Sequence, residues 1–138
     1  MATMLIRKAI SADWDRIYQL AEECGLDYPG MDKDDFLVAE DGGRLRGIVG
    51  LKRHPGGLEL CSLGVEPGGR RRGVGGELVK ALLAGLREDV YLATVIPGYF
   101  ERLGFRRTAV FPDAMVKDPD WCAGCRRDLC TVMVRRPG

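Results

Sequence analysis

LGVEPGGRRRGVGG, residues 63–76, is the stretch that decides the fold. It begins as the end of an apolar strand, passes through a turn of glycines and arginines, and continues into apolar residues at helical spacing. The N-terminus of a helix carries unpaired N–H groups and a partial positive charge, and both favour a bound anion. The stretch therefore predicts a strand, a turn and a helix that present a site for a pyrophosphate or a similar anion.

The glycines and arginines of this turn have separate parts in that prediction. Gly73, Gly75 and Gly76 lack a Cβ atom, so the backbone can approach a phosphate group closely, and the arginines add cationic donors. A solvated basic loop and a site for another phosphorylated ligand are the alternatives. The turn lacks the Lys-Ser/Thr ending of a P-loop, and Leu78 stands where a dinucleotide-binding fingerprint has its third glycine.

The residues before this stretch predict strands and one helix. Apolar alternation indicates strands over residues 5–9, 36–40, 45–51 and 58–65, with glycine turns at 41–43 and 54–57. Ser11 is placed to cap a helix over residues 12–24, which ends at Gly25. The 26–33 segment is predicted to be a loop with a short helical turn.

The residues after it predict an alternation of helices and strands. Helical spacing runs from Val74 to Leu86, and a second short helix is expected over residues 98–103. Strands are expected over residues 91–95, 105–111 and 131–135. The order predicts an α/β fold of the α+β kind, with a mixed, mostly antiparallel sheet flanked by helices. We expect a single domain over residues 1–138.

Composition excludes several classes of protein. The chain has 138 residues, 46% of them hydrophobic and 30% charged, which is the balance of a globular domain. A net charge of +1 gives no global attraction to nucleic acid or to anionic lipid. No apolar run is long enough to cross a bilayer, and the first residues resemble a strand, so we expect a cytoplasmic protein.

Two blocks of the sequence resemble the GNAT superfamily of acyl-CoA N-acyltransferases. Arg70-x-x-Gly73-x-Gly75 is similar to the Arg/Gln-x-x-Gly-x-Gly/Ala motif of that family, and the same strand and helix flank it. YFERLGF, residues 99–105, resembles the family's Phe-Tyr-Glu-Lys-Leu-Gly-Phe block near the C-terminus. The strand and helix order of the family covers nearly the whole chain.

The resemblance implies acetyl-CoA as cosubstrate, with its pyrophosphate on the turn. It also implies that the strand ending at Val65 splays from its neighbour near residues 91–94, with the pantetheine arm in the gap. The residues to which it assigns CoA binding are Leu63, Gly64, Val65, Arg70, Arg71, Arg72, Gly73, Val74, Gly75, Gly76 and Phe100.

Acetyl transfer needs a base, because a primary amine is mostly protonated at neutral pH. Glu59 is the preferred candidate, since it lies on the strand that leads into the turn, and some family members have a glutamate base at this offset. Strict alternation would place Glu59, Cys61, Leu63 and Val65 on one face of the strand. A surface carboxylate is the alternative. His54 lies in a Pro/Gly turn and is expected to be exposed.

The general acid is where the sequence departs from the family. Many members have a tyrosine where this chain has Phe100, and phenylalanine cannot donate a proton. Tyr99 is adjacent, but one helical step turns it about 100° away, so we expect a packing residue or a substrate contact. A thiol with a pKa of about 8.5 is a leaving group that needs little help.

The C-terminal cysteines form a segment of their own, within residues 112–130. Cys122, Cys125 and Cys130 have spacing that could hold zinc if a fourth ligand came from elsewhere in the chain. Free thiols, or one disulfide formed on oxidation, are the alternatives, and no metal site is assigned. Five cysteines are an odd number, which argues against a fully paired disulfide framework.

Three segments resemble small amino-acid N-acetyltransferases. Residues 59–65 and 120–135 are similar to those of the N-acetylglutamate synthase type, and residues 36–40 are similar to the arsenic-resistance type. The resemblance implies a small amine acceptor rather than a protein tail, with Arg7, Lys52 and Arg53 as candidate partners for its carboxylate. A homodimer is expected from the resemblance alone. The alternative function is a non-catalytic CoA-binding or metal-sensing or redox-sensing module that uses the cysteines.

Overall fold

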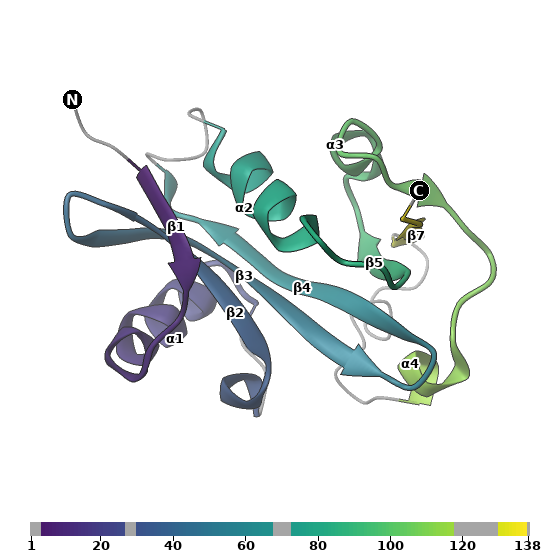
Figure 1. Cartoon of the computed structure of the whole chain (residues 1–138), viewed down its shortest axis with the longest axis horizontal. Coiled ribbons are helices and arrows are strands. Elements are labelled where there is room, and N and C mark those ends of the chain that lie inside the picture. The colour runs from purple at the N-terminus through teal and green to yellow at the C-terminus, as the bar shows by residue number, and fades with distance from the viewer. Residues whose placement is uncertain (1–3, 27–29, 68–72, 118–129, 138) are drawn as a thin grey trace. The chain divides into compact units, whose positions relative to one another are not determined.

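The computed structural model describes residues 4–26, 30–67, 73–117 and 130–137. Its contacts group into two compact units, Met1–Leu51 with Ser62–Ala84, and Lys52–Cys61 with Gly85–Gly138. Hydrogen bonds join seven strands in the order β1-β2-β3-β4-β5-β7-β6 (Figure 1). The predicted fold class, a mostly antiparallel mixed sheet with helices, is confirmed, while the single domain stays a prediction.

In the first unit, β1 (Met4–Lys8), β2 (Asp35–Asp41) and the part of β3 (Arg44–His54) up to Leu51 form an antiparallel sheet. Gly42 and Gly43 join β2 to β3 with φ angles of +60° and +79°. Two successive positive φ angles are those of a type I′ turn, whose twist matches that of a hairpin. The predicted turn is confirmed at these two glycines.

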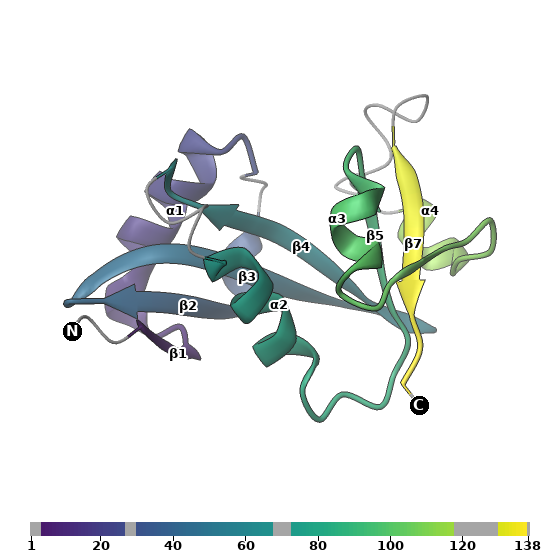
Figure 2. The same ribbon diagram turned by 90° about the horizontal axis from the view of Figure 1, so that it is seen from above.

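Two helices cover opposite faces of β2 and β3 in this unit (Figure 2). The helix α1 (Trp14–Glu23) buries Ile17, Leu20 and Ala21 in a cluster that contains Val38 and Ile48, which are paired across β2 and β3. The other helix, α2 (Val74–Leu83), packs against Gly47, the residue directly before Ile48 in β3. Val74 and Leu78 therefore lie on the face of the sheet that α1 does not cover.

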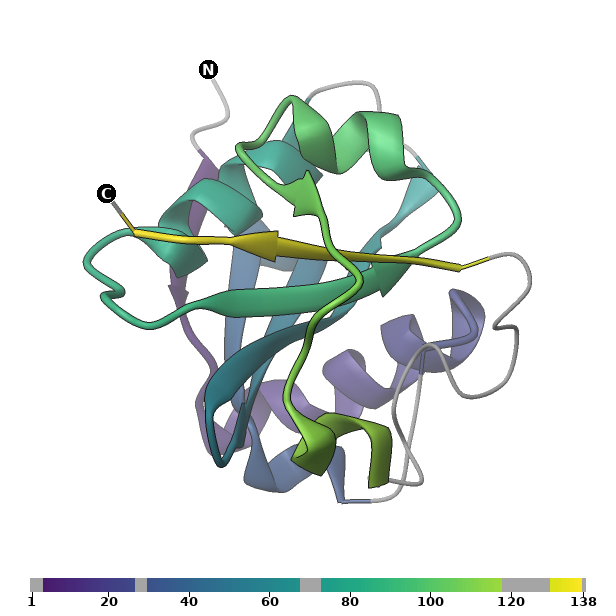
Figure 3. The same ribbon diagram turned by 90° about the vertical axis from the view of Figure 1, so that its right-hand side faces the viewer.

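The second unit holds β5 (Val90–Thr94), β6 (Arg106–Arg107) and β7 (Thr131–Arg135), with β7 antiparallel to both neighbours. The helices α3 (Pro97–Glu101) and α4 (Asp113–Lys117) lie on opposite sides of β5 and β7 (Figure 3). Met115 of α4 packs with Tyr91 and Val134 to form the core on its side. β4 (Gly57–Val65) pairs in parallel with β5 at Leu58–Val90 and Glu59–Tyr91.

Three local predictions were wrong in their details. The helix expected at residues 12–24 begins as a 3-10 turn, η1 (Ser11–Asp13), and Ser11 caps neither element; instead Asp13 accepts a hydrogen bond from the N–H of Ile10 at 2.8 Å. The strand expected at 105–111 is only two residues long, because the Thr108 hydroxyl bonds the N–H and C=O of Val110 and turns the backbone. The helix α4 was missed.

The short turn η2 (Met31–Lys33) agrees with the helical turn expected before β2. Within the described residues, no helix is long and apolar enough to cross a membrane.

Gly47 is a place where the fold needs a glycine for space. A Cβ atom there would lie 2.9 Å from Leu78 Cδ1, 3.1 Å from Val74 Cγ1 and 3.3 Å from the carbonyl oxygen of Gly64. We expect Gly47→Ala to lower the free energy of unfolding by about 1–3 kcal/mol, because α2 must move outward. Urea-induced unfolding followed by circular dichroism measures this change.

Gly98→Ala is the matched control. A Cβ atom at Gly98, in α3, would meet nothing within 4 Å, so the variant is expected to unfold at the wild-type urea midpoint or slightly above it. A Gly47→Ala protein as stable as the Gly98→Ala protein would show that α2 does not pack on β3 as described.

Candidate functional site

The helix predicted after the glycine-rich turn is present as α2, which begins at Val74. Gly73 is the N-cap of α2 with φ +74° and ψ +19°, a left-handed conformation that favours glycine. Val74 and Gly75 are buried in the first turn of the helix, and Gly76 is partly buried. The amide groups of this first turn have no carbonyl partners within the helix, which leaves them available to an anion. Arg70, Arg71 and Arg72 lie outside the described residues.

A carboxylate directly before the turn is held by three arginines that sequence reasoning missed. Glu66 is 7% exposed, and its carboxylate is bonded by Arg46 and lies 2.9 Å from Arg16 Nη2 and 3.4 Å from Arg44 Nη2. The N–H of Glu66 also donates to the carbonyl oxygen of Arg46 at 2.9 Å. The end of β4 is therefore tied by backbone and side chain to β3, and by side chain to α1.

These arginines set the protonation of Glu66. The hydrogen bond from Arg46, helped by the positive charges of Arg44, Arg46 and Arg16, holds the pKa of Glu66 below its ordinary value of 4.5, against the opposing effect of burial. Glu23 also lies 3.9 Å from Arg16 Nη1, and Asp41 adds a negative charge near Arg46, so carboxylates balance the three arginines. The cluster is therefore a set of ion pairs that fixes the end of β4.

β4 changes its conformation at Ser62. This residue has a φ of +51°, which is uncommon for a residue with a side chain, and its hydroxyl donates to the carbonyl oxygen of Leu26 at 3.0 Å. A left-handed residue inside a strand breaks strict alternation, so the single face expected for Glu59 through Val65 does not continue past Ser62. Leu63 is partly buried, while Gly64 and Val65 are buried.

Glu59 and His54 form a buried pair in the second unit. His54 Nε2 lies 2.8 Å from Glu59 Oε1, and the exposed fractions of the two side chains are 5% and 1%. The expectation that His54 is an exposed turn residue was therefore wrong. β3 extends through His54, the turn is confined to Pro55 and Gly56, and β4 returns beside β3 with Glu59 within reach. Prediction of an eleven-residue strand that ends at His54 would have been needed to place this residue outside the turn.

The partial ladder between β4 and β5 bears on the predicted splay. Among the described residues, Leu58 and Glu59 of β4 pair with Val90 and Tyr91, the first two residues of β5. β5 continues to Thr94, and Leu92, Ala93 and Thr94 pair with β7. The ladder thus stops at Glu59, before the stretch of β4 to which the resemblance assigned pantetheine binding.

Phe100 and Tyr99 lie side by side in α3. Phe100 is buried, and its ring meets those of Tyr99 and Phe105 edge-on, with centroids 5.1 Å and 5.8 Å apart. Tyr99 is partly buried, and this burial raises the pKa of its hydroxyl. The packing agrees with the expectation that Tyr99 is a packing residue, while its part in catalysis stays a prediction.

Arg7 is committed to two carboxylates of its own unit. Its guanidinium binds Asp13 through both oxygens, at 2.7 and 3.0 Å, and Glu40 at 2.9 Å. These bonds raise the pKa of Arg7 above its ordinary value, and the bond from Arg7 lowers that of Asp13. Arg7 therefore ties β1 to β2 and η1, which argues against a role in binding a substrate carboxylate. Lys52 and Arg53 stay predictions.

The cysteine predictions fall mostly outside the described residues. Cys122 and Cys125 lie in the 118–129 segment, which the structure does not describe. Cys130 is partly buried and packs against the cluster of Tyr91, Met115 and Val134. The zinc, free-thiol and disulfide alternatives for the three cysteines stay predictions.

Comparison with known proteins identifies the family. The model of the acetyltransferase (GNAT) domain family matches residues 32–107, more than half of the chain. The chain therefore belongs to the GNAT acetyltransferase family. The match includes β4, the phosphate turn, α2 and the YFERLGF block.

Solved structures show the same fold. The N-acetylglutamate synthase of Neisseria gonorrhoeae, in complex with coenzyme A and N-acetyl-glutamate, is similar over 99% of this chain, with a TM-score of 0.76 and 22% sequence identity. This chain spans only 35% of that protein. Rv2747 of Mycobacterium tuberculosis, in complex with CoA, has a TM-score of 0.76 at 19% identity, over 97% of this chain and 99% of its own. Naa50 of Arabidopsis thaliana, in complex with the bisubstrate analogue CoA-Ac-MVNAL, has a TM-score of 0.72 at 14% identity, over 97% and 99%.

The arginine cluster around Glu66 leads to a stability prediction. Glu66→Gln removes the charge that the three arginines face, so the free energy of unfolding should fall by about 1–3 kcal/mol near neutral pH. Because the folded-state pKa of Glu66 is lowered, its contribution is present above its ordinary pKa of 4.5 and is lost as the pH falls through the folded value. In that acidic range the free energy of unfolding of the wild type should approach that of the Glu66→Gln variant. Urea midpoints measured across pH test both statements.

Glu77→Gln is the matched control, because Glu77 is an exposed carboxylate in α2 that lies 3.9 Å from Lys80. Its midpoint should stay within about 0.5 kcal/mol of the wild type. Equal stability of the Glu66→Gln and wild-type proteins at neutral pH would contradict a structural role for the cluster.

Proposed function

We propose that this protein transfers the acetyl group of acetyl-CoA to the primary amine of a small molecule, an amino acid or a close analogue, by direct attack in a ternary complex. The observation that carries the proposal is the buried pair of His54, at the end of β3, and Glu59, on β4, the strand that leads into the phosphate turn. A carboxylate and an imidazole in hydrogen-bond contact, both withdrawn from bulk water, are suited to accept a proton. Family membership supplies the acetyl donor.

In this proposal the phosphate turn and β4 hold acetyl-CoA. The amide groups at the start of α2, from Gly73 to Gly76, donate to the pyrophosphate, and Arg70, Arg71 and Arg72 add charge-assisted contacts. The space at Gly73 fits a close phosphate approach, since a Cβ atom there would have no neighbour within 4 Å. Backbone groups of Leu63 and Val65 pair with the pantetheine arm, and Gly64, Val74 and Phe100 complete the binding residues.

Glu59 takes the proton of the substrate ammonium, directly or through a water molecule. The free amine attacks the carbonyl carbon of the thioester, a C–N bond forms, and the carbonyl oxygen becomes an oxyanion that needs a donor, usually a backbone N–H. When the intermediate collapses the C–S bond breaks, and the CoA thiolate leaves and takes a proton. His54 acts through Glu59, because its Nε2 lies against Oε1 and fixes the orientation of the carboxylate.

Two solved neighbours illustrate the range of acceptors in the fold. The gonococcal synthase is bound to N-acetyl-glutamate, and the Arabidopsis protein to a bisubstrate analogue with the peptide sequence MVNAL. We favour the amino-acid class because the segments at 36–40, 59–65 and 120–135 resemble small amino-acid N-acetyltransferases. A cytoplasmic location and a homodimer remain part of this proposal.

Removing the charge of Glu59 should separate catalysis from binding. We expect Glu59→Gln to lower kcat by about 100-fold or more, since the amine then lacks its base, while the Kd for CoA stays unchanged. His54→Gln keeps a hydrogen-bond donor but removes the imidazole, so it should lower kcat less and change the shape of the pH–rate profile. Release of free thiol from acetyl-CoA, measured across a panel of amino acids, polyamines and peptides, gives the rates.

Glu88→Gln, an exposed carboxylate of the same unit, is the control and should have the wild-type rate. Wild-type turnover by Glu59→Gln at saturating amine would remove Glu59 as the base. CoA binding by the wild type with no thiol release for any amine in the panel would overturn the enzyme and favour a CoA-binding module.

The neighbouring tyrosine gives a second test of the mechanism. If the thiolate leaves without a protein acid, Tyr99→Phe should keep kcat within about twofold of the wild type, because only the hydroxyl is lost. The same thiol-release assay measures the rate. A large fall in kcat at unchanged KM would instead identify Tyr99 as the acid that replaces the family tyrosine absent at Phe100.

A further inference from the structure

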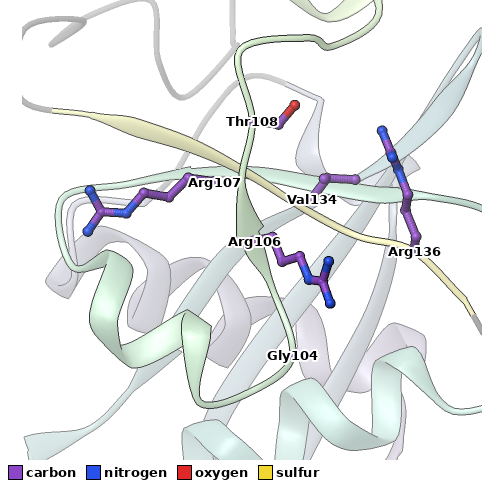
Figure 4. Close-up of a pocket in the computed structure, with 6 residues that line it drawn as sticks. All are labelled: Gly104, Arg106, Arg107, Thr108, Val134 and Arg136. Carbon is purple, nitrogen blue, oxygen red and sulfur yellow. The ribbon is translucent and has the colours of Figure 1, made fainter.

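A cavity of about 380 Å³ lies at the β6 edge of the sheet (Figure 4). All of its lining residues belong to the second unit: Gly104, Arg106, Arg107, Thr108, Val134 and Arg136. Three of the six are arginines, and none is acidic. We call this feature the arginine pocket.

Strand register explains why the arginines gather there. Arg106 is paired with Val134 across β6 and β7, so these two side chains share a face. Arg136 directly follows β7, two residues after Val134, and lines the cavity together with Arg106. Figure 4 shows both on one side of the β6 ribbon, with Arg107 extending to the other.

Gly104 provides the space. It has a φ of +95° and directly precedes Phe105 and β6, and a Cβ atom on it would meet nothing within 4 Å. Because no side chain projects there, the surface between the arginines stays hollow. The Thr108 hydroxyl is already bonded to Val110, so the guanidinium groups are the donors that the pocket offers.

The positive charge of the pocket is only partly compensated. Arg136 Nε lies 3.7 Å from Asp89 and Arg107 Nη2 lies 3.6 Å from Glu101, and all four side chains are at least 36% exposed. Arg106 forms no ion pair with any residue that the structure describes. Like charges on neighbouring strands destabilise a sheet, so an anion bridging Arg106 and Arg136 would relieve their repulsion.

We propose that the arginine pocket binds a small molecule that carries two oxyanionic groups. A guanidinium presents a planar fork of donors that matches a carboxylate or a phosphate, and two such forks select a ligand with a group for each. The volume suits a small metabolite. Dicarboxylates and pyrophosphate compounds share this chemistry, and they are the two sources that the experiment separates.

Charged residues also protect the exposed edge of a sheet from pairing with another chain. β6 is a two-residue edge strand, so protection alone would account for arginines there. It would not require a hollow beside them or donors aligned on one face. A protective role predicts no saturable anion binding, which makes the two accounts distinguishable.

Nuclear magnetic resonance titration of isotope-labelled protein tests the proposal residue by residue. Pyrophosphate, malonate, succinate and glutarate are added in turn at constant ionic strength, and acetate serves as the singly charged comparison. We expect saturable shifts of the amide resonances of Arg106, Thr108 and Val134 with at least one dianion. Shifts at Gly73 and Gly75 report the phosphate turn separately, so pyrophosphate binding there cannot be mistaken for the pocket.

Variants of the pocket complete the test. The double variant Arg106→Gln/Arg136→Gln should bind the dianion at least about tenfold more weakly at the pocket amides. Arg87→Gln, which removes an exposed arginine of the same unit that does not line the pocket, should bind as the wild type does. Preference for a dicarboxylate or for pyrophosphate identifies the source. The proposal is wrong if no dianion saturates the pocket amides, if acetate binds equally well, or if the double variant keeps wild-type affinity.

Discussion

The ion cluster at Glu66 fixes the point where the chain leaves β4. This carboxylate is the first residue after β4, and Arg46 of β3, Arg16 of α1 and Arg44 converge on it. The backbone of Glu66 is bonded to Arg46 as well, so the chain leaves β4 at a defined point and in a defined direction. In the proposed function the glycine-rich segment that follows presents amide groups to a pyrophosphate, and an anchor directly before it limits the freedom that glycines give the backbone.

A second buried carboxylate, Glu59, has a different character because of its neighbours. Glu66 is surrounded by arginines that are always charged, and these keep it ionised as a structural anion. Glu59 instead forms a buried hydrogen-bonded pair with the imidazole of His54. Two glutamates on or next to one strand thus have unlike partners, three arginines for one and a histidine for the other.

The arginine pocket of the second unit also gathers arginines that lie far apart in the sequence. The doubled arginines of FRRT and VRRP lie about thirty residues apart in the sequence, yet the pairing of β6 with β7 brings the two segments together. Glu66 is a buried counterion for its arginines, whereas Asp89 and Glu101 pair with Arg136 and Arg107 at longer, exposed contacts. We propose a ligand as the further source of negative charge at the pocket.

The sequence by itself determined the order of strands and helices apart from α4, the glycine turn between β2 and β3, and the helix start at Gly73. These features depend on interactions between neighbouring residues, and the positive φ angles of Gly42, Gly43 and Gly73 follow from glycine's freedom at those points. It also identified Glu59 as the candidate base. Only the tertiary structure decided which residues face it: His54 becomes a buried partner because β3 runs on to it and β4 returns alongside. The arginines that pair with Glu66 come from positions 16, 44 and 46. The pairing of β6 with β7 brings together the segments that contain Arg106 and Arg136. Such contacts join distant segments, and hydrophobic periodicity carries no information about which charged side chains the folded chain brings together.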